Sequence, residues 1–421
     1  MLHEIPLVGM VAVRVLYFKG TICLLRRYYR FVVMAGVISG LVGCVSPIAM
    51  DHAVIGYDRA HAQIQTQLLL LNIARARNHM PIHFTAVPNV AATFDFRMNA
   101  GLAREPLRNG GGGMALALGT SVAENPTINI VPIQGEAFTK RLLTPMDESK
   151  FEFMAHQGVD IGMVLRLMVR AILIEKNGVR TIFHNDARHI KEFQQFRRAV
   201  FHLAALEYAG VLDIGPINYD RQWSISGRDP SMDELLKIAE RGYFWTTEEN
   251  EKIFSKPVRG RILIANFDPN TLSNFERRRL DKKARQYPNN FILVDIRPGY
   301  PGGEFPIQAW IKLRSFNAVI EFIANSMHSY PEFRVEKDPR SGTIPANPVK
   351  TLEILESSEK PKNVDFFVEY HSAYYWLADD KSRHEPDISW NQEVFKLLYH
   401  LYQMTVMDVT HVPGLPISIA K

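Results

Sequence analysis

The chain has 421 residues, of which 47% are hydrophobic and 22% are charged. This balance is typical of a globular protein and excludes collagen-like, low-complexity and polytopic membrane proteins. Its two cysteines, Cys23 and Cys44, are too few for a disulfide scaffold. The length permits one large domain or two.

The basic excess lies at the N-terminus. Residues 1–43 hold five of the 49 basic residues but only one of the 44 acidic residues. The rest of the chain therefore carries 44 basic and 43 acidic residues, which leaves no excess charge for phosphate binding to explain. We expect no nucleic-acid partner.

The leader has the order of a secretory signal. Residues 26–30 (RRYYR) form a basic patch after a long n-region, and residues 31–43 carry no charge. The segment Leu41-Val-Gly-Cys44 resembles the lipobox of bacterial lipoproteins. The resemblance implies cleavage between Gly43 and Cys44, a diacylglyceryl group on the Cys44 sulfur, and palmitate or another acyl chain on the new amino terminus.

An uncleaved anchor is the alternative for this segment. The uncharged stretch continues to Met50 and is about long enough to cross a bilayer, but Ser46 and Pro47 dilute its far end. Val45 stands where lipoproteins retained at the inner membrane tend to have Asp. We therefore expect an outer-membrane lipoprotein facing the periplasm, whose several acyl chains give stable anchoring to membrane lipid.

The first part of the body begins with a tether over residues 44–55. A broad apolar pattern predicts a buried helix over residues 57–78. Short strands are predicted over residues 82–87 and 128–133, on either side of Gly110–Gly113. This glycine run lacks the Lys-Ser/Thr of a phosphate loop, so it indicates a hairpin tip.

The middle of the chain is predicted to be mainly helical. Asp160 caps a helix whose apolar face extends to Ile172 and which ends at Asn177-Gly178. A second helix covers residues 187–209. Ser231 and Glu234 form a capping box that opens a third helix.

The remaining elements alternate between strand and helix. The predicted ranges are β-structure at 243–267, a helix at 272–286, a buried strand at 291–296, a turn at 297–306 and an amphipathic helix at 307–329. After these come a loop at 338–348, a strand at 364–370 and a helix opened by a capping box at Ser389–Gln392.

These elements predict an α+β fold, mainly helical, with short and mostly antiparallel strands. The expected divisions are a signal peptide (1–43), a tether (44–55), a main body (56–337), an exposed loop or linker (338–350) and a C-terminal segment packing on the body (351–421).

The densest cluster of potential metal ligands is His184, Asp186 and His189. It lies just before a predicted helix, where Asn185 and Asp186 are ordinary capping residues, and it lacks zinc-site spacing. We therefore assign no metal, no cofactor and no catalytic residue.

Three other motifs have an ordinary structural interpretation. The basic run Phe275–Arg285 could meet anionic lipid or nucleic acid, but a solvated helix face with Asp281 and Arg285 paired at i,i+4 is favoured. Ser357 and Lys360 match S-x-x-K without its companion motifs S-D-N and K-T-G. The aromatic run 374–376 favours packing over a ligand platform.

Four segments together resemble a group of uncharacterised bacterial lipoproteins. They are QLLLLNIARAR (67–77), NPTIN (125–129), GEAFTKRLLTP (135–145) and KLRS (312–315). The resemblance covers most of the mature chain and implies an envelope location, but it implies no activity. Within it, Asn72, Arg75 and Arg77 are expected to organise a buried helix end.

The sequence therefore favours a cell-envelope lipoprotein that binds or scaffolds an envelope component, with an envelope protein as a candidate partner. The alternative is a periplasm-facing hydrolase whose site is assembled from scattered residues.

Overall fold

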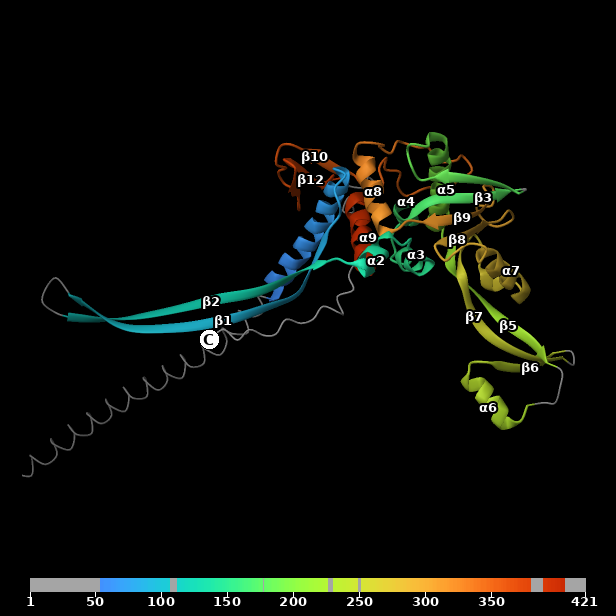
Figure 1. Ribbon diagram of the computed structural model, residues 1–421, viewed down its shortest axis with the longest axis horizontal. Coiled ribbons are helices and arrows are strands. Elements are labelled where there is room, and N and C mark those ends of the chain that lie inside the picture. The colour runs from blue at the N-terminus through green and yellow to red at the C-terminus, as the bar shows by residue number, and fades with distance from the viewer. Residues whose placement is uncertain are drawn as a thin grey trace, which may run out of the picture. The chain divides into compact units, whose positions relative to one another are not determined.

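The computed structural model describes residues 54–106, 112–176, 178–225, 230–248, 251–379 and 389–405. The chain divides into two compact units, Met1–Ile64 and Gln65–Lys421. The described part of the first unit, residues 54–64, is helical. The second unit begins with helical residues 65–77 and contains every element named below (Figure 1). The predicted helix is confirmed, whereas Gly43 and Cys44 lie outside the described residues.

Strands β1 (Phe84–Pro106) and β2 (Gly112–Ile133) form a long antiparallel ribbon. Its register is continuous except for one bulge near Ala86, and neither strand pairs with another described strand. The predicted hairpin is confirmed, but its strands are much longer than the two short segments that the sequence suggested. Gly112 and Gly113 belong to β2, whereas Gly110 and Gly111 of the predicted tip lie outside the described residues.

A seven-stranded sheet forms the centre of the second unit, in the order β4-β3-β9-β8-β7-β5, with β6 paired to β7. Its strands are β3 (Val169–Lys176), β4 (Val179–His184), β5 (Asp213–Ile225), β6 (Phe244–Glu248), β7 (Glu251–Ala265), β8 (Phe291–Ile296) and β9 (Ile307–Leu313). Neighbours are antiparallel except β7 and β8. Every residue of β8 is buried, as predicted for residues 291–296.

Strands β5 and β7 continue beyond this sheet as a second ribbon. The partner β8 pairs with β7 only at Leu263–Ala265, whereas β5 follows β7 back to Lys252. Strand β6 pairs with the far part of β7, and helix α6 (Met232–Glu240) precedes it (Figure 1).

The other helices surround the sheet. They are α2 (Glu136–Leu143), α3 (Glu148–Ala155), α4 (Ile161–Met168), α5 (Ile190–Tyr208), α7 (Asn274–Ala284), α8 (Phe316–Met327) and α9 (Trp390–Thr405), with one 3-10 turn at Pro269–Thr271. Asp160 caps α4, and Ser231 and Ser273 each close a capping box. The cap predicted at Ser389 is wrong, because its hydroxyl has no hydrogen-bond partner among the described residues, although α9 does form.

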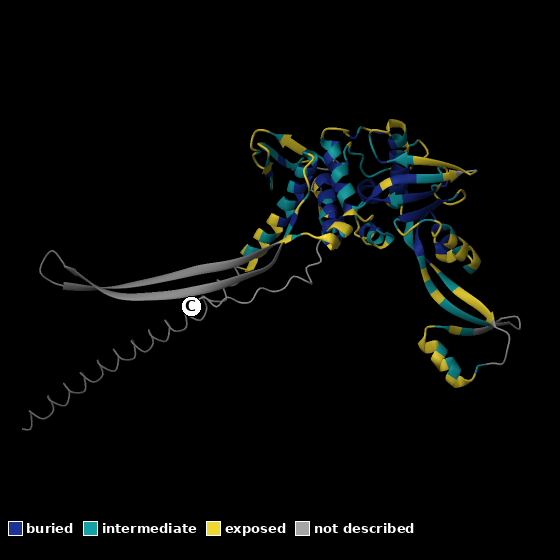
Figure 2. Cartoon of the chain, viewed as in Figure 1, coloured by how far each residue is buried: buried dark blue, intermediate teal, exposed yellow. Residues whose placement is uncertain are grey.

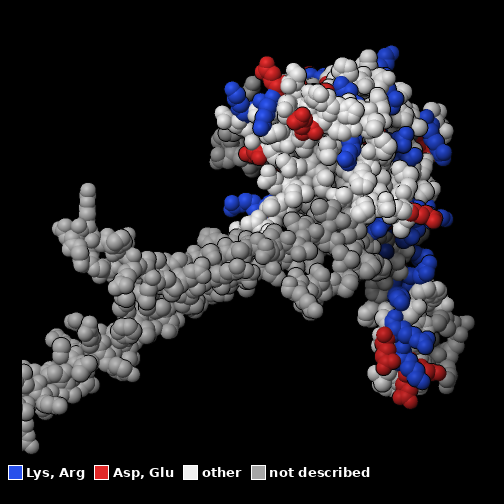
Figure 3. Space-filling view, turned by 60° about the vertical axis from the view of Figure 1, so that its left-hand side comes forward, with Lys and Arg blue, Asp and Glu red and all other residues white. Residues whose placement is uncertain are grey.

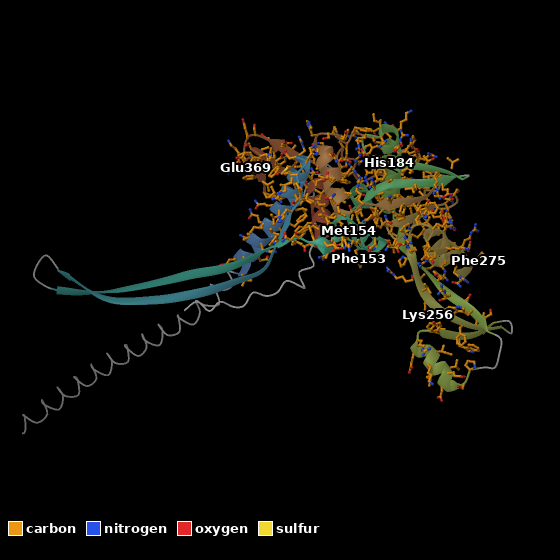
Figure 4. The ribbon with its side chains drawn as sticks, in the orientation of Figure 1. Phe153, Met154, His184, Lys256, Phe275 and Glu369 are labelled. Atoms are coloured by element: carbon orange, nitrogen blue, oxygen red, sulfur yellow. The ribbon has the colours of Figure 1, made fainter. Side chains whose placement is uncertain are left out.

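The main core lies between the helices and one face of the sheet (Figure 2). All of α4 is buried, and α8 and α9 bury one side each. In α3, Met154 is buried while its neighbour Phe153 is exposed, so the helix separates core from solvent within one residue (Figure 4). A second, small sheet has three strands. Their order in the sheet is β10 (Ile354–Ser357), β12 (Ala373–Leu377) and β11 (Val368–Tyr370).

Two predicted helices are each half wrong. The chain leaves α4 at Met168 and continues as β3, and β9 precedes α8 where one helix was predicted. Ile172 and Ile311, both assigned to helices, are partners in adjacent strands. A physical cause is Arg314, whose guanidinium donates to the carbonyls of Arg166 and Leu167 and so occupies acceptors that a continuing helix would need.

The fold is α+β with mostly antiparallel strands, as the sequence predicts. The expectation of a mainly helical body with short strands was overstated, because the two ribbons use long strands.

Candidate functional site

A polar cavity of about 350 Å³ lies at the loop between β4 and α5. His184, Asp186 and His189 all line it, so the cluster found in the sequence does face one space (Figure 4 labels His184). The other wall includes Asn317 and Glu321 of α8. The fold thus places residues more than 120 positions apart around one cavity.

The Asp186 carboxylate is already paired. It accepts from the Arg188 Nε atom at 3.0 and 2.9 Å and from Nη2 at 2.5 Å. Burial alone would raise the pKa of Asp186, but these contacts hold it below its ordinary value. A carboxylate that is ion-paired in this way and has a lowered pKa is poorly suited to accept a proton near neutral pH.

The loop does not cap α5 in the predicted way. His189 occupies the N-cap and makes no side-chain cap bond, while the Asp186 Oδ1 atom accepts from the Arg188 amide at 3.0 Å. Asp186 therefore closes a turn of its own loop, and its role as a helix cap was predicted wrongly. Asn185 is buried and donates to the carbonyls of Arg166 and Val169.

His184 and His189 lie on either side of one carboxylate. The Glu192 Oε2 atom is 3.7 Å from His184 Nε2 and 3.9 Å from His189 Nδ1, and the ring centroids are 5.0 Å apart. Within the described ranges, no group of three or more His, Cys, Asp or Glu side chains is arranged to hold a metal ion. Both imidazoles therefore lie within 4 Å of the Glu192 carboxylate beside the cavity.

The cavity lining includes Arg170, Arg188 and Arg314 together with the carboxylates Asp186 and Glu321, and it contains no Ser, Thr, Cys or Lys. Arg188 is already paired with Asp186. Arg314 is buried and also donates to the Asn185 carbonyl. Burial lowers its pKa to about 9, which leaves it charged at neutral pH.

The residues behind the family resemblance fix the architecture. The side chain of Asn72 is fully buried. Its Nδ2 atom donates a hydrogen bond to the His83 carbonyl at 2.9 Å, and its Oδ1 atom accepts one from the His83 backbone amide at 2.7 Å. Arg75 Nη1 donates to the same carbonyl at 3.0 Å and to Asn72 Oδ1 at 3.1 Å. Asn72 and Arg75 therefore connect the helix to the chain entering β1, as expected for residues that organise a helix end.

Two further motifs of the resemblance meet in space. Pro145 forms a β-bridge with Ser315, and the Met146 amide donates to the Arg314 carbonyl at 2.9 Å. Ser315 also caps α8. The segments 135–145 and 312–315 thus join α2, β9 and α8.

Helix α7 keeps the basic face predicted from the sequence. Arg285 pairs with the buried Asp281 at 2.6 Å, which confirms the predicted i,i+4 contact. Phe275 is 74% exposed (Figure 4). Figure 3 shows acidic and basic side chains interspersed on the described part of the face in view, which is typical of a solvated surface.

The two remaining sequence motifs do not form sites. The Ser357 hydroxyl accepts from the Glu359 amide, and the Lys360 ammonium lies over the Phe367 ring, so the S-x-x-K residues have separate contacts. Tyr375 is buried in the core and its hydroxyl donates to Glu356, which confirms packing for the centre of the aromatic run.

The exposed apolar side of α6 was not predicted from the sequence. Met232 is 72% exposed and Leu236 is 57% exposed, and no residue of the helix is buried (Figure 2). The Lys256 ammonium fixes the end of the helix by donating to the Arg241 carbonyl at 3.3 Å (Figure 4). The spacing of Met232 and Leu236, four residues apart, is present in the sequence, but only the structure shows that nothing in the described chain covers them.

Comparisons with protein-family models, curated proteins and solved structures found no match to this chain. Among the described residues, no helix is both long enough and apolar enough to cross a membrane. The family resemblance and the lipid attachment at Cys44 therefore stay predictions.

Proposed function

We propose that this chain is a bacterial cell-envelope lipoprotein, anchored through acylated Cys44 at the outer membrane and facing the periplasm. Its body binds or scaffolds another envelope protein. The anchor is supported by the basic patch, apolar stretch and lipobox-like Leu41–Cys44 of the leader. The binding role is supported by one structural observation, the uncovered apolar side of α6.

The α6 surface consists of Met232 and Leu236, which lie one turn apart on the helix and are exposed by 72% and 57%. A helix of nine residues is not stable alone in water, so contacts with its ribbon must hold it. Exposed apolar residues grouped in this way are typical of a contact site.

Charges around the α6 surface favour a protein partner. Asp233 and Lys237 lie on the same short helix, so both signs border the apolar residues. A polar rim around an apolar centre is the usual composition of a protein interface, whereas moving such charges into lipid is costly.

The anchor is tested by replacing Cys44 with Ala. Wild type should incorporate labelled palmitate, become shorter by 43 residues and fractionate with the outer membrane, whereas the variant should remain uncut and unlabelled. Val45→Asp should shift the processed protein toward the inner membrane. Identical behaviour of wild type and Cys44→Ala would refute the lipoprotein proposal and favour the uncleaved anchor.

The α6 surface is tested by photocrosslinking in intact cells. A photoreactive residue at Leu236 should give one discrete adduct with an envelope protein, while the same residue at the neighbouring Lys237 should give much less. Leu236→Asp should abolish co-purification of that partner without changing palmitate labelling. Equal crosslinking at both positions would contradict a specific interface.

The cavity at His184 supports a second candidate, a periplasm-facing hydrolase that uses water as its nucleophile. Imidazoles and carboxylates facing one space are the groups that general acid-base chemistry needs. Purified protein would be assayed against ester and phosphoester substrates beside His184→Ala. Turnover that the substitution removes would support the hydrolase, and no turnover in either protein would leave the binding role as the better account.

A further inference from the structure

Residue types alternate along the β1–β2 ribbon. In β1, residues 94, 96, 98, 100 and 102 are Phe, Phe, Met, Ala and Leu, and the residues between them are Asp, Arg, Asn and Gly. In β2, residues 114, 116, 118, 120 and 122 are Met, Leu, Leu, Thr and Val, and those between them are Ala, Ala, Gly and Ser. Each strand therefore has one mainly apolar set and one polar or small set.

The register brings the two apolar sets together. Phe96 is opposite Val122, and Leu102 is opposite Leu116. Because successive residues of a strand belong to opposite faces, these positions share one face of the ribbon. The polar and small sets share the other face.

The apolar band has the length of a membrane-crossing strand. Residues 94–102 and 114–122 are nine-residue segments, and a transmembrane strand needs about 9–11 residues. The register offsets the two segments by two residues, so a charged residue type stands opposite the terminal residue of each: Glu124 is opposite Phe94 at one end, and Arg104 is opposite Met114 at the other. Alternating segments of about this length are typical of strands in outer membranes.

Nothing else in the described chain pairs with this ribbon. A two-stranded ribbon alone is at best marginally stable in water, so the band needs a cover. The apolar set of β1 contains no charged residue type from Phe94 to Leu102, in contrast to the α6 surface with its mixed charges.

We propose that the β1–β2 ribbon inserts into the lipid bilayer with residues 94–102 and 114–122 at the depth of the acyl chains. This inference rests on the proposed function, because the acylated Cys44 would bring the ribbon to a membrane surface. The polar set, with Asp95 and Arg97, faces away from lipid.

Insertion requires further copies of this chain. In lipid every backbone N–H and C=O must be paired, and the outer edges of β1 and β2 have no partner strand among the described residues. Ribbons of neighbouring copies pair along these edges and satisfy them. The inserted form is therefore an oligomer, with the polar set turned toward its interior.

The test uses the cysteine content of the mature protein. After cleavage Cys44 is the only cysteine and its thiol is acylated, so one introduced cysteine carries the only free thiol. Single cysteines at positions 94 to 102 and 114 to 122 are labelled with an environment-sensitive fluorophore, and each lipoprotein is reconstituted into phosphatidylethanolamine–phosphatidylglycerol vesicles. Nitroxide-labelled lipid then reports contact with acyl chains.

We expect quenching with a period of two residues. Positions 94, 96, 98 and 102 should be quenched at least about twofold more than positions 95, 97 and 99. A cysteine replacing the exposed Phe275 is the water-facing control. Phe96→Arg should lower the inserted fraction at least about thirtyfold, whereas Asn99→Arg on the polar set should not.

Other outcomes overturn the inference. Uniform water-like emission means that the ribbon stays outside the bilayer. Alternating blue-shifted emission without quenching by nitroxide lipid means that protein covers the band. Failure of the anchor is separable, because an unacylated Cys44 would itself label in the protein without an introduced cysteine.

Discussion

Replacing Glu332 with Ala should strongly destabilise the body. The Glu332 carboxylate and the Arg197 guanidinium form an ion pair in which both side chains are buried. The carboxylate also accepts from the Thr351 amide at 2.5 Å, the Thr351 hydroxyl at 2.7 Å and the Ser326 hydroxyl at 3.2 Å. Residues 328–351 contain no helix or strand, and this network connects that segment to α5 and α8.

The expected loss is about 3–5 kcal/mol, because the substitution leaves Arg197 charged and buried without its counterion. Deleted hydrogen bonds to a charged group cost about 1.5–3 kcal/mol each, but losses within one network do not add. The double variant Arg197→Met, Glu332→Leu removes both charges and should recover most of the stability.

Urea unfolding followed by tryptophan fluorescence measures these differences. Glu336→Ala is the matched control, since Glu336 and Arg334 form an ion pair with side chains 75% and 63% exposed, worth about 0–1 kcal/mol. Equal losses at Glu332 and Glu336 would refute the reasoning. A double variant as unstable as Glu332→Ala would refute the role of the uncompensated charge.

The same pair predicts a response to acid. Burial alone would raise the pKa of Glu332, but Arg197, Arg166 and the hydrogen bonds from Thr351 hold it below the ordinary value. A carboxyl group whose pKa is depressed in the folded state stabilises the fold at pH values above its unfolded pKa of about 4.3. This stabilisation is lost as the pH falls through the folded-state pKa. Wild type should therefore lose stability below about pH 4 more steeply than the double variant.

Three other changes test single features. Burial raises the pKa of Glu207 to about 7, so the contribution of Glu207 to stability falls as the pH rises from its ordinary pKa toward 7. After allowance for solvent screening, Glu207→Gln should raise the free energy of unfolding by about 1–2 kcal/mol at pH 8. The gain at pH 5 should be smaller. Asn72→Ala should cost about 1–3 kcal/mol by urea unfolding, because it leaves the backbone groups of His83 unpaired. Gly260→Ala should lower the melting temperature, because an added Cβ would lie 2.6 Å from the Asp281 Oδ1 atom.

Local chemistry made some helices predictable from the sequence. Ser231 and Ser273 each precede a Glu by three residues, and both capping boxes form with the predicted reciprocal bonds. Gly210 adopts a positive φ directly after the helix that was predicted over residues 187–209. Each of these signals lies within one turn of the chain, although the same signal at Ser389 did not produce a cap.

Partners distant in sequence were not predictable. Residues 307–313 satisfy a helical apolar pattern, but β9 forms because it has β3 and β8 as neighbours. Arg197, Arg314 and Glu332 gave no signal at all, because a lone charged residue in a sequence indicates solvent exposure until its buried partner is known.

The candidate site was predicted only in part. His184, Asp186 and His189 are neighbours in sequence and do line one cavity, but the opposite wall comes from α8. The period-two signal of residues 94–102 was present in the sequence, and the glycine-rich stretch after it suggested short strands. Only the continuous register of β1 and β2 joins the two alternating segments.

The α6 surface and the β1–β2 band are suited to different binding partners. Asp233 and Lys237 border the apolar residues of α6, so transfer into lipid would require desolvating charges of both signs. A protein partner can pair such charges at its rim and bury only Met232 and Leu236. The band of residues 94–102 and 114–122 offers lipid an apolar set free of charged residue types. Added salt should therefore weaken capture of the α6 partner and leave lipid quenching of the ribbon unchanged, because screening acts on exposed charges and not on apolar burial.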